Sequence, residues 1–251
     1  MSPTRLAPEA ELPLLRTRVS EIADRALVVG DPNRAKLVSE MLENPRLLSA
    51  NREYHVYAGT YNGVPVTVAS HGVGAAGAAV CFEELARAGV TRIIRSGTAG
   101  GIQPEVVDGA IVVATGAVRE EGISGQLVPR SFPAIATPEL TLALRAAAAT
   151  TGLDVHEGIV LTADLFYPSD VQIGVDHALW QRAGVVAVEM EAAALFVVAS
   201  LNGIESGAVL AIDGNPLAKK DDSMSGYDPH RAIVGQAVDG ALRTALEALV
   251  S

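Results

Sequence analysis

The chain has 251 residues, of which 49% are hydrophobic, 19% are charged and only 4% are aromatic. Its 19 basic and 29 acidic side chains give a formal net charge of −10, which argues against nucleic-acid binding because that function needs a basic face. The hydrophobic content excludes a disordered chain, and the core must be built mainly from Ala, Val, Leu and Ile. Such a core favours buried parallel strands covered by helices of small residues.

Three sequence features narrow the setting of the protein. The single cysteine, Cys81, excludes an internal disulfide and a multi-thiolate metal site. The first ten residues contain two prolines and no apolar run, so no signal peptide is predicted. The most apolar region, residues 184–204, is interrupted by Glu189 and Glu191, which argues against a membrane span. Because no linker-like stretch divides the chain, we expect one soluble, cytoplasmic domain over residues 1–251.

Apolar runs, most of four to six residues and closed by glycine, predict buried strands. They cover residues 26–29, 64–69, 92–94, 110–114, 158–161 and 207–212. Helical patterns cover residues 32–42, 78–88, 189–201 and 231–250, with Asp31 as the cap of the first helix and Pro32 at its first position. Residues 54–61 and 64–69, joined by Asn62-Gly63, predict an antiparallel hairpin. The predicted fold class is therefore α/β, a single domain with a mixed central β-sheet flanked by helices.

A glycine-rich segment follows the strand predicted at residues 64–69. Gly72-Val73-Gly74-Ala75-Ala76-Gly77 fits the G-x-G-x-x-G pattern of dinucleotide sites. An acidic residue about 20 positions on would bind the ribose of NAD, but Arg95 stands there and suits only the 2′-phosphate of NADP. Close packing of a helix on a sheet explains the motif more simply. An NADP-dependent oxidoreductase is kept as the alternative of another class.

Two arginines lie where predicted strands end at glycine-rich turns. Arg34 falls in the first turn of a predicted helix, where free N–H groups favour an anion. Arg95 closes the strand at residues 92–94, and in open α/β sheets the carboxyl ends of strands hold the ligands. Two guanidinium groups directed at one crevice predict a small dianion such as phosphate, whereas pairing with surface carboxylates is the structural alternative.

Acidic side chains interrupt two apolar segments. Glu189 and Glu191 enter the apolar region 184–204, and buried carboxylates are costly unless they are hydrogen-bonded. A sugar diol would satisfy one of them, while a role at a helix N-terminus is the alternative. Asp213 ends the strand at residues 207–212 before a glycine, where it suits either proton donation to a ligand or an Asx turn.

The aromatic pair Phe166-Tyr167 follows a predicted strand and suits either stacking on a ring or core packing. The five histidines show no metal-ligand spacing, so we expect no metal site.

As an ordered set, several of these segments resemble the nucleoside phosphorylase family that contains hexameric purine nucleoside phosphorylases and uridine phosphorylases. The similarity runs from about Val28 to Pro216, and it is nearest to the purine enzymes of protozoan parasites. The matching segments are Val29-Gly30-Asp31-Pro32-Asn33-Arg34, Asn51-Arg52-Glu53-Tyr54, Ser70-His71-Gly72-Val73-Gly74, Ile93-Ile94-Arg95-Ser96-Gly97-Thr98, Phe166-Tyr167-Pro168, Val188-Glu189-Met190-Glu191 and Ile212-Asp213-Gly214.

The resemblance implies phosphorolysis, in which a nucleoside and inorganic phosphate give a free base and ribose 1-phosphate without a metal or organic cofactor. It implies a homo-oligomer, a hexamer built as a trimer of dimers, in which Arg52 enters the phosphate site of the neighbouring subunit. The implied catalytic residues are Asp213, which protonates purine N7, and Arg95. The other implied contacts are Gly30, Arg34, Arg52, Arg95 and Thr98 to phosphate, Met190 and Glu191 to ribose, and Phe166, Ala99, Gly100, Glu189 and Asp213 to the base.

The choice of base rests on two positions. Uridine enzymes of this family carry a Gln-x-Arg pair after the segment matching Phe166-Tyr167-Pro168, but here Gln172 is followed by Ile173 and Gly174. They also generally lack an acid at the place of Asp213. Both points favour a purine nucleoside phosphorylase over a uridine phosphorylase, and a catalytically silent nucleoside-binding protein is a further alternative.

One position departs from the family pattern. The family usually carries an N-terminal histidine that reaches the neighbour's ribose 5′-hydroxyl, whereas here no histidine precedes His55. Arg16, Thr17 or Arg18 is expected in its place.

Overall fold

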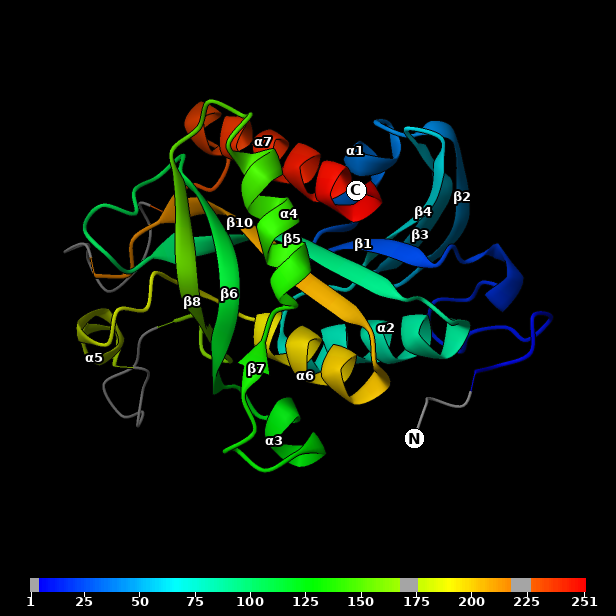
Figure 1. Ribbon diagram of the computed structural model, residues 1–251, viewed down its shortest axis with the longest axis horizontal. Coiled ribbons are helices and arrows are strands. Elements are labelled where there is room, and N and C mark those ends of the chain that lie inside the picture. The colour runs from blue at the N-terminus through cyan, green and yellow to red at the C-terminus, as the bar shows by residue number, and fades with distance from the viewer. Residues whose placement is uncertain (1–4, 168–175, 218–226) are drawn as a thin grey trace.

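The computed structural model describes residues 5–167, 176–217 and 227–251. In these ranges a ten-stranded mixed sheet forms the centre of the molecule (Figure 1). Its strands are β1 (Arg25–Val29), β2 (Glu43–Asn51), β3 (Tyr54–Tyr61), β4 (Val64–Ser70), β5 (Arg92–Gly101), β6 (Ile111–Glu120), β7 (Ala134–Ile135), β8 (Val155–Ala163), β9 (Ala187–Glu189) and β10 (Glu205–Gly214).

Strand β5 is the branch point of the sheet. It pairs in parallel with β1 and β10 and antiparallel with β9. Because β10 continues through β6 and β8 back to β9, these strands close into a ring with β5. On the other side, β1 leads in parallel to β4 and then to the antiparallel strands β3 and β2. The carboxyl ends of β4, β1, β5 and β10 therefore meet at one edge.

Helices cover both faces of the sheet (Figure 1). On one face α2 (Ala75–Ala88) and α6 (Ala192–Asn202) share a core with β5, β6 and β10, and α3 (Ile123–Leu127) packs near them. On the other face α1 (Pro32–Ser39), α4 (Pro138–Ala148) and α7 (Ala232–Val250) bury a second apolar cluster. The short η1 (Val19–Glu21) and α5 (His177–Arg182) complete the helices of the described ranges. The predicted α/β class with one mixed sheet is confirmed.

Most predicted elements are present. The hairpin forms, and Asn62 and Gly63 have φ values of 50° and 74°, as such a tight turn requires. The Asp31 side chain caps α1 by accepting a hydrogen bond of 2.8 Å from the Asn33 N–H. Several boundaries differ from those predicted. The strand at residues 92–94 continues as β5 to Gly101, so Arg95 lies inside the strand and does not close it. The helix predicted from Glu189 begins at Ala192, because Glu189 ends β9 and its carboxylate accepts a hydrogen bond from the Ala192 N–H.

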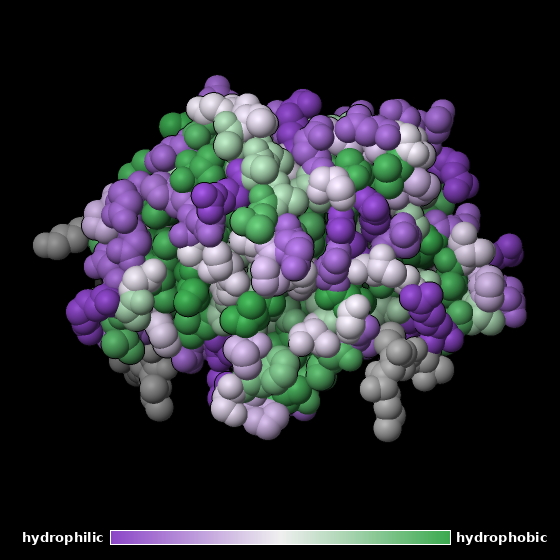
Figure 2. Space-filling view, viewed as in Figure 1, coloured by the Kyte–Doolittle hydropathy of each residue, from purple (hydrophilic) through white to green (hydrophobic). Residues whose placement is uncertain are grey.

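Figure 2 shows polar and apolar side chains interspersed over one face, with apolar residues gathered towards the lower edge, over α3 and β7. Leu127 of α3 and Ile135 of β7 are exposed. In the ranges that the structure describes, no helix combines the length and the apolar character needed to cross a membrane.

Candidate active site

A cavity of about 740 Å³ opens at the edge where the carboxyl ends of the parallel strands meet. Its walls include Gly30 after β1, Gly72 after β4, residues 97–100 of β5 and the end of β10. This is the edge at which open α/β sheets hold their ligands. Nearly all the residues singled out from the sequence line it: Gly30, Arg34, Arg95, Thr98, Ala99, Gly100, Phe166, Glu189, Met190, Glu191 and Asp213.

Arg52 is not among the described residues that line this cavity. It is exposed in the turn between β2 and β3, where its φ of 55° lies in the left-handed region. Of the residues proposed for the ribose 5′ position, Arg16 pairs with Glu11 at 3.0 Å, and Thr17 is buried. None of these side chains contributes to the cavity of its own chain.

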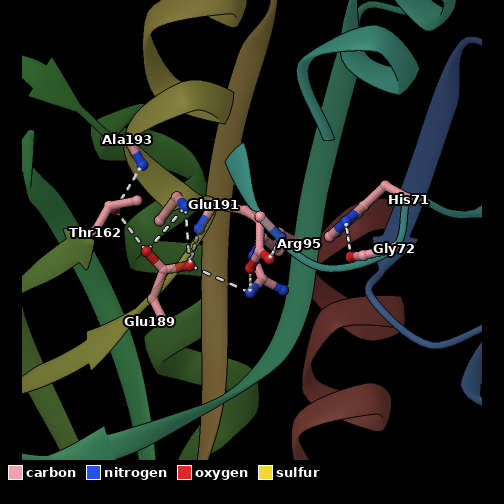
Figure 3. A network of polar contacts seen from close by, with 9 residues as sticks. His71, Gly72, Arg95, Thr162, Glu189, Glu191 and Ala193 are labelled. Atoms are coloured by element: carbon pink, nitrogen blue, oxygen red, sulfur yellow. Dashed lines mark hydrogen bonds and ion pairs between the residues drawn. The ribbon is translucent and has the colours of Figure 1, made fainter. Parts of the chain in front are cut away.

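Arg95 is the buried cation at the centre of the site, with 3% of its surface exposed. Its Nη2 donates a hydrogen bond to Oε2 of Glu191 and lies 3.2 Å from Oε2 of Glu189 (Figure 3). Its Nε and Nη1 have no hydrogen-bond partner among the described residues. A Cβ at Gly97 would overlap Nη1 of Arg95, so any other residue there forces the guanidinium to move. Both nitrogens are buried in the wall of the cavity, where an unsatisfied positive charge favours a nearby anion.

Arg34 brings a second cation to the same cavity from the first turn of α1. Burial, and then the nearby positive charge of Arg95, lower the pKa of Arg34 from its ordinary value. Two guanidinium groups that repel each other across one cavity are stabilised by a bound anion. Arg34 and Arg95 thus line one cavity, and their role in phosphate binding stays a prediction.

Glu191 links the cavity to the glycine-rich turn before α2. Its Oε1 accepts a hydrogen bond of 2.6 Å from the Gly74 N–H at the N-terminus of that helix. A carboxylate of the chain itself thus occupies the position that a dinucleotide pyrophosphate would need. Gly72 serves packing, since a Cβ there would lie 2.9 Å from Cγ of Glu53. This arrangement contradicts the dinucleotide reading of Gly72, Gly74 and Gly77.

Glu189 is saturated with hydrogen bonds from its own surroundings (Figure 3). It accepts from the Thr162 hydroxyl at 2.5 Å and from the Glu191 and Ala192 N–H groups at 2.8 and 2.9 Å. Burial raises the pKa of the Glu189 carboxyl, and Arg95 together with these donors opposes that rise. The carboxylate thereby fixes the start of α6 and the orientation of Arg95.

Asp213 lies in the cavity wall because β10 contains a bulge at this residue. Ile212 pairs with Ala99 and Gly214 pairs with Gly100, so Asp213 is an extra residue that bulges from the ladder. Its Oδ2 accepts a hydrogen bond of 2.7 Å from the Tyr227 hydroxyl. Burial raises the pKa of the Asp213 carboxyl, while hydrogen bonds from Tyr227 and Thr98 lower it in part. A carboxyl group of this kind suits proton donation.

Aromatic side chains line another part of the cavity. Phe166 lies edge-to-face with Tyr167 and Tyr227, with ring centroids 5.1 and 5.9 Å apart. The rings of Phe166, Tyr167 and Tyr227 suit packing against a planar ligand.

The stretch 168–175, which includes Gln172, lies outside the described residues.

Two functional candidates were missed in the sequence. Tyr227 follows a polar loop without recognisable periodicity, so nothing in the sequence pointed to Asp213 as its partner. His71 is fully buried and donates from Nδ1 to the Gly72 carbonyl at 2.9 Å. Burial, followed by the positive charge of Arg95, lowers its pKa to about 3. The only sequence signal for His71 was its place between a strand and a glycine.

Fold and site together define an α/β protein whose cavity combines two arginines, acidic side chains and aromatic rings. The family model described as "Phosphorylase superfamily" matches residues 24–249. Guanosine phosphorylase of Halorubrum lacusprofundi is 32% identical over 242 residues, which cover 96% of this chain and 99% of the relative. Uridine phosphorylase of Haemophilus influenzae is 34% identical, covering 91% of this chain and 94% of the relative.

A solved structure agrees with these sequence relatives. The purine nucleoside phosphorylase from Toxoplasma gondii in complex with immucillin-H is 31% identical, with a TM-score of 0.89 over 97% of this chain and 96% of that chain. The chain therefore belongs to the nucleoside phosphorylases of the phosphorylase superfamily and is a pentosyltransferase. The family resemblance seen in the sequence motifs is confirmed, and the relatives are divided between purine and uridine enzymes.

Proposed function

We propose that this enzyme is a purine nucleoside phosphorylase that reversibly converts inosine- or guanosine-type nucleosides and phosphate into free base and ribose 1-phosphate. The observation that carries the proposal is the carboxyl group of Asp213, which lines the same cavity as Arg34 and Arg95. A purine needs a proton on N7 as it departs, and Asp213 is an acid whose burial favours the protonated form.

Phosphate is held by cations at one end of this cavity. The unpartnered Nε and Nη1 of Arg95 and the guanidinium of Arg34 provide charged donors. The Thr98 hydroxyl and the backbone at Gly30 line the same region and complete the phosphate contacts. We expect no cofactor, because inorganic phosphate, the co-substrate, is itself the nucleophile.

Ribose lies between the phosphate and the base. Glu191, fixed by Gly74 and Arg95, accepts hydrogen bonds from the sugar hydroxyls, and Met190 covers the apolar face of the ring. The base then lies along Phe166, Ala99 and Gly100, within reach of Asp213. Glu189 acts from behind this wall through the contacts that orient Arg95 and Glu191.

Cleavage of the glycosidic bond develops positive charge on the ribose and negative charge on the base. Phosphate held by arginines stabilises the sugar cation and then captures it at C1′. Asp213 neutralises the departing purine by protonating N7. Both interactions strengthen in the transition state, which is the condition for catalysis rather than mere binding.

The active unit is a homo-oligomer, a hexamer of three dimers, in which Arg52 completes the phosphate site of a neighbouring subunit. The exposure of Arg52 and its position outside its own cavity support this assignment. Mixing subunits that carry Arg52→Ala with subunits that carry Arg34→Ala tests it. Mixed dimers regain one intact site and hence activity, whereas equal inactivity of mixed and unmixed samples would contradict a shared site.

The base is tested by measuring release from inosine and from uridine, each with and without phosphate. We expect phosphate-dependent release of hypoxanthine and much slower release of uracil. The uridine alternative is supported by the names of relatives at similar identity, and preferential uracil release would establish it in place of the purine proposal. Base release that is independent of phosphate would contradict phosphorolysis altogether.

A further inference from the structure

Tyr227 contacts the proposed acid, although no motif of the sequence led to it. Its hydroxyl donates a hydrogen bond of 2.7 Å to Oδ2 of Asp213, and its ring lines the cavity beside Phe166. Burial, and then the hydrogen bond to Asp213, raise the pKa of Tyr227 well above its ordinary value. The phenol therefore remains protonated and acts as a donor to this carboxyl group.

The position of Tyr227 is fixed by Arg231, four residues further along the chain. Arg231 donates from Nη2 to the Asp213 carbonyl at 2.9 Å and from Nη1 to the Asp108 carboxylate at 2.6 Å. Its Nε donates to the Asp228 carbonyl at 3.0 Å. One guanidinium thus ties the chain directly after Tyr227 to the backbone of Asp213, and the contact between the two side chains is built into the fold.

We propose that Tyr227 is a positioning residue for Asp213. The Tyr227 hydroxyl engages Oδ2 of Asp213, so that Oδ1 is the oxygen that delivers the proton to N7 of the purine. This inference rests on the proposed purine phosphorolysis. A carboxyl group that is free to rotate presents either oxygen in several orientations. When Oδ2 is held by a hydrogen bond, the carboxyl group presents its acidic proton in one orientation, so the reactive geometry is reached more often.

The hydroxyl also affects when Asp213 is protonated. A donor to a carboxylate stabilises the ionised form, so its removal raises the pKa of the acid. The other groups that face Asp213 are Thr98 on β5, Arg34 on α1 and Asp108 before β6. Arg231 contacts the Asp213 carbonyl from the segment before α7. These groups remain in place when only the phenol oxygen is removed.

Tyr227→Phe separates the hydroxyl from the ring, because the ring still lines the cavity and contacts Phe166. With inosine we expect kcat to fall about 10-fold, the scale of one hydrogen bond, with little change in KM. We also expect the alkaline limb of the kcat profile to move to higher pH. The matched control is Tyr61→Phe, which removes a tyrosine–carboxylate hydrogen bond of 2.6 Å to Glu247 on the exposed surface.

A purine nucleoside already methylated at N7, such as 7-methylguanosine, provides the second substrate. Its base departs without needing a proton, so Tyr227→Phe should leave its turnover unchanged. An equal loss with inosine and 7-methylguanosine, or an unmoved alkaline limb, would overturn the positioning role and leave only packing. Unchanged kcat with inosine would overturn it as well.

A titration without turnover separates this inference from the proposed function. Carbon-13 NMR of the Asp213 carboxyl should give a higher pKa in Tyr227→Phe than in the wild-type enzyme. A wild-type enzyme that does not cleave inosine refutes the purine proposal. An active wild-type enzyme whose Asp213 pKa and kcat are the same in Tyr227→Phe refutes only the role of Tyr227.

Discussion

Arg95 and Glu191 form a buried ion pair, yet in the proposed complex they bind different parts of the reactants. Arg95 faces phosphate and Glu191 faces the sugar hydroxyls. The pair engages only Nη2 of Arg95 and leaves Nε and Nη1, which are buried, without partners among the described residues. In the proposed complex, phosphate and nucleoside are therefore bound by one connected set of charged side chains.

Arg95→Met tests the structural side of this pair. The substitution leaves Glu189 and Glu191 buried without their cation, and removing one partner of a buried pair costs about 3–5 kcal/mol. We expect the free energy of unfolding in urea to fall by that amount, together with a loss of phosphorolysis. The double variant Arg95→Met/Glu191→Gln should recover part of the stability but none of the activity. Additive effects on stability would contradict a coupled pair.

Asp213→Asn tests the proton donor. Asparagine keeps the shape of the side chain but has no acidic proton, and a general acid typically contributes 10²–10⁴-fold. We expect kcat for inosine to fall by at least about 100-fold. The circular dichroism spectrum and Tm should be retained. Near-normal turnover of inosine would remove Asp213 from the mechanism.

The strands that build this cavity could be predicted from the sequence, because β1, β4, β5 and β10 each contain a short apolar run that is followed by glycine. The edge strand β2 was missed because its residues, Glu43–Asn51, are mostly exposed and show no apolar alternation. Helix α4 was also missed, although Pro138 stands at its first position, as is common at helix starts. Local apolar pattern thus predicted the core and not the periphery.

The candidate site shows the same division. Arg34 and Asp213 could be placed because one begins a helix and the other ends a strand, where topology fixes the direction of the chain. Arg95 was expected after its strand, but it lies inside β5, which continues to Gly101. The bulge at Asp213 and the contact with Tyr227 depend on pairing between segments distant in the sequence. Such pairings are decided by tertiary packing, which no local pattern records.

Gly97→Ala tests the space beneath Arg95. The methyl group that this substitution adds would overlap Nη1 of Arg95, so the guanidinium must move. Its Nη2, however, is held by the carboxylates of Glu189 and Glu191. We expect KM for phosphate to rise at least about 10-fold, since one charged hydrogen bond contributes about 1.5–3 kcal/mol. The matched control is Gly77→Ala in α2, where the nearest atom to the new methyl, the His71 carbonyl oxygen, lies at an ordinary contact distance of 3.5 Å. Equal phosphate KM values in both variants would contradict the steric argument.

His71 gives the fold a pH dependence of its own. Its pKa is lowered from 6.5 to about 3 in the folded protein, so the folded chain keeps the ring neutral between these values while the unfolded chain takes up a proton. Stability is therefore complete above pH 6.5 and is lost as the pH falls towards 3; at pH 5 the loss amounts to about 2 kcal/mol. His71→Asn keeps a donor for the Gly72 carbonyl and removes this titration. Urea unfolding at pH 7.5 and pH 5 should thus show a smaller acid destabilisation in His71→Asn than in the wild-type enzyme, since the carboxylates titrate alike in both. If both proteins lost the same unfolding free energy between these pH values, the neutral buried imidazole would be disproved.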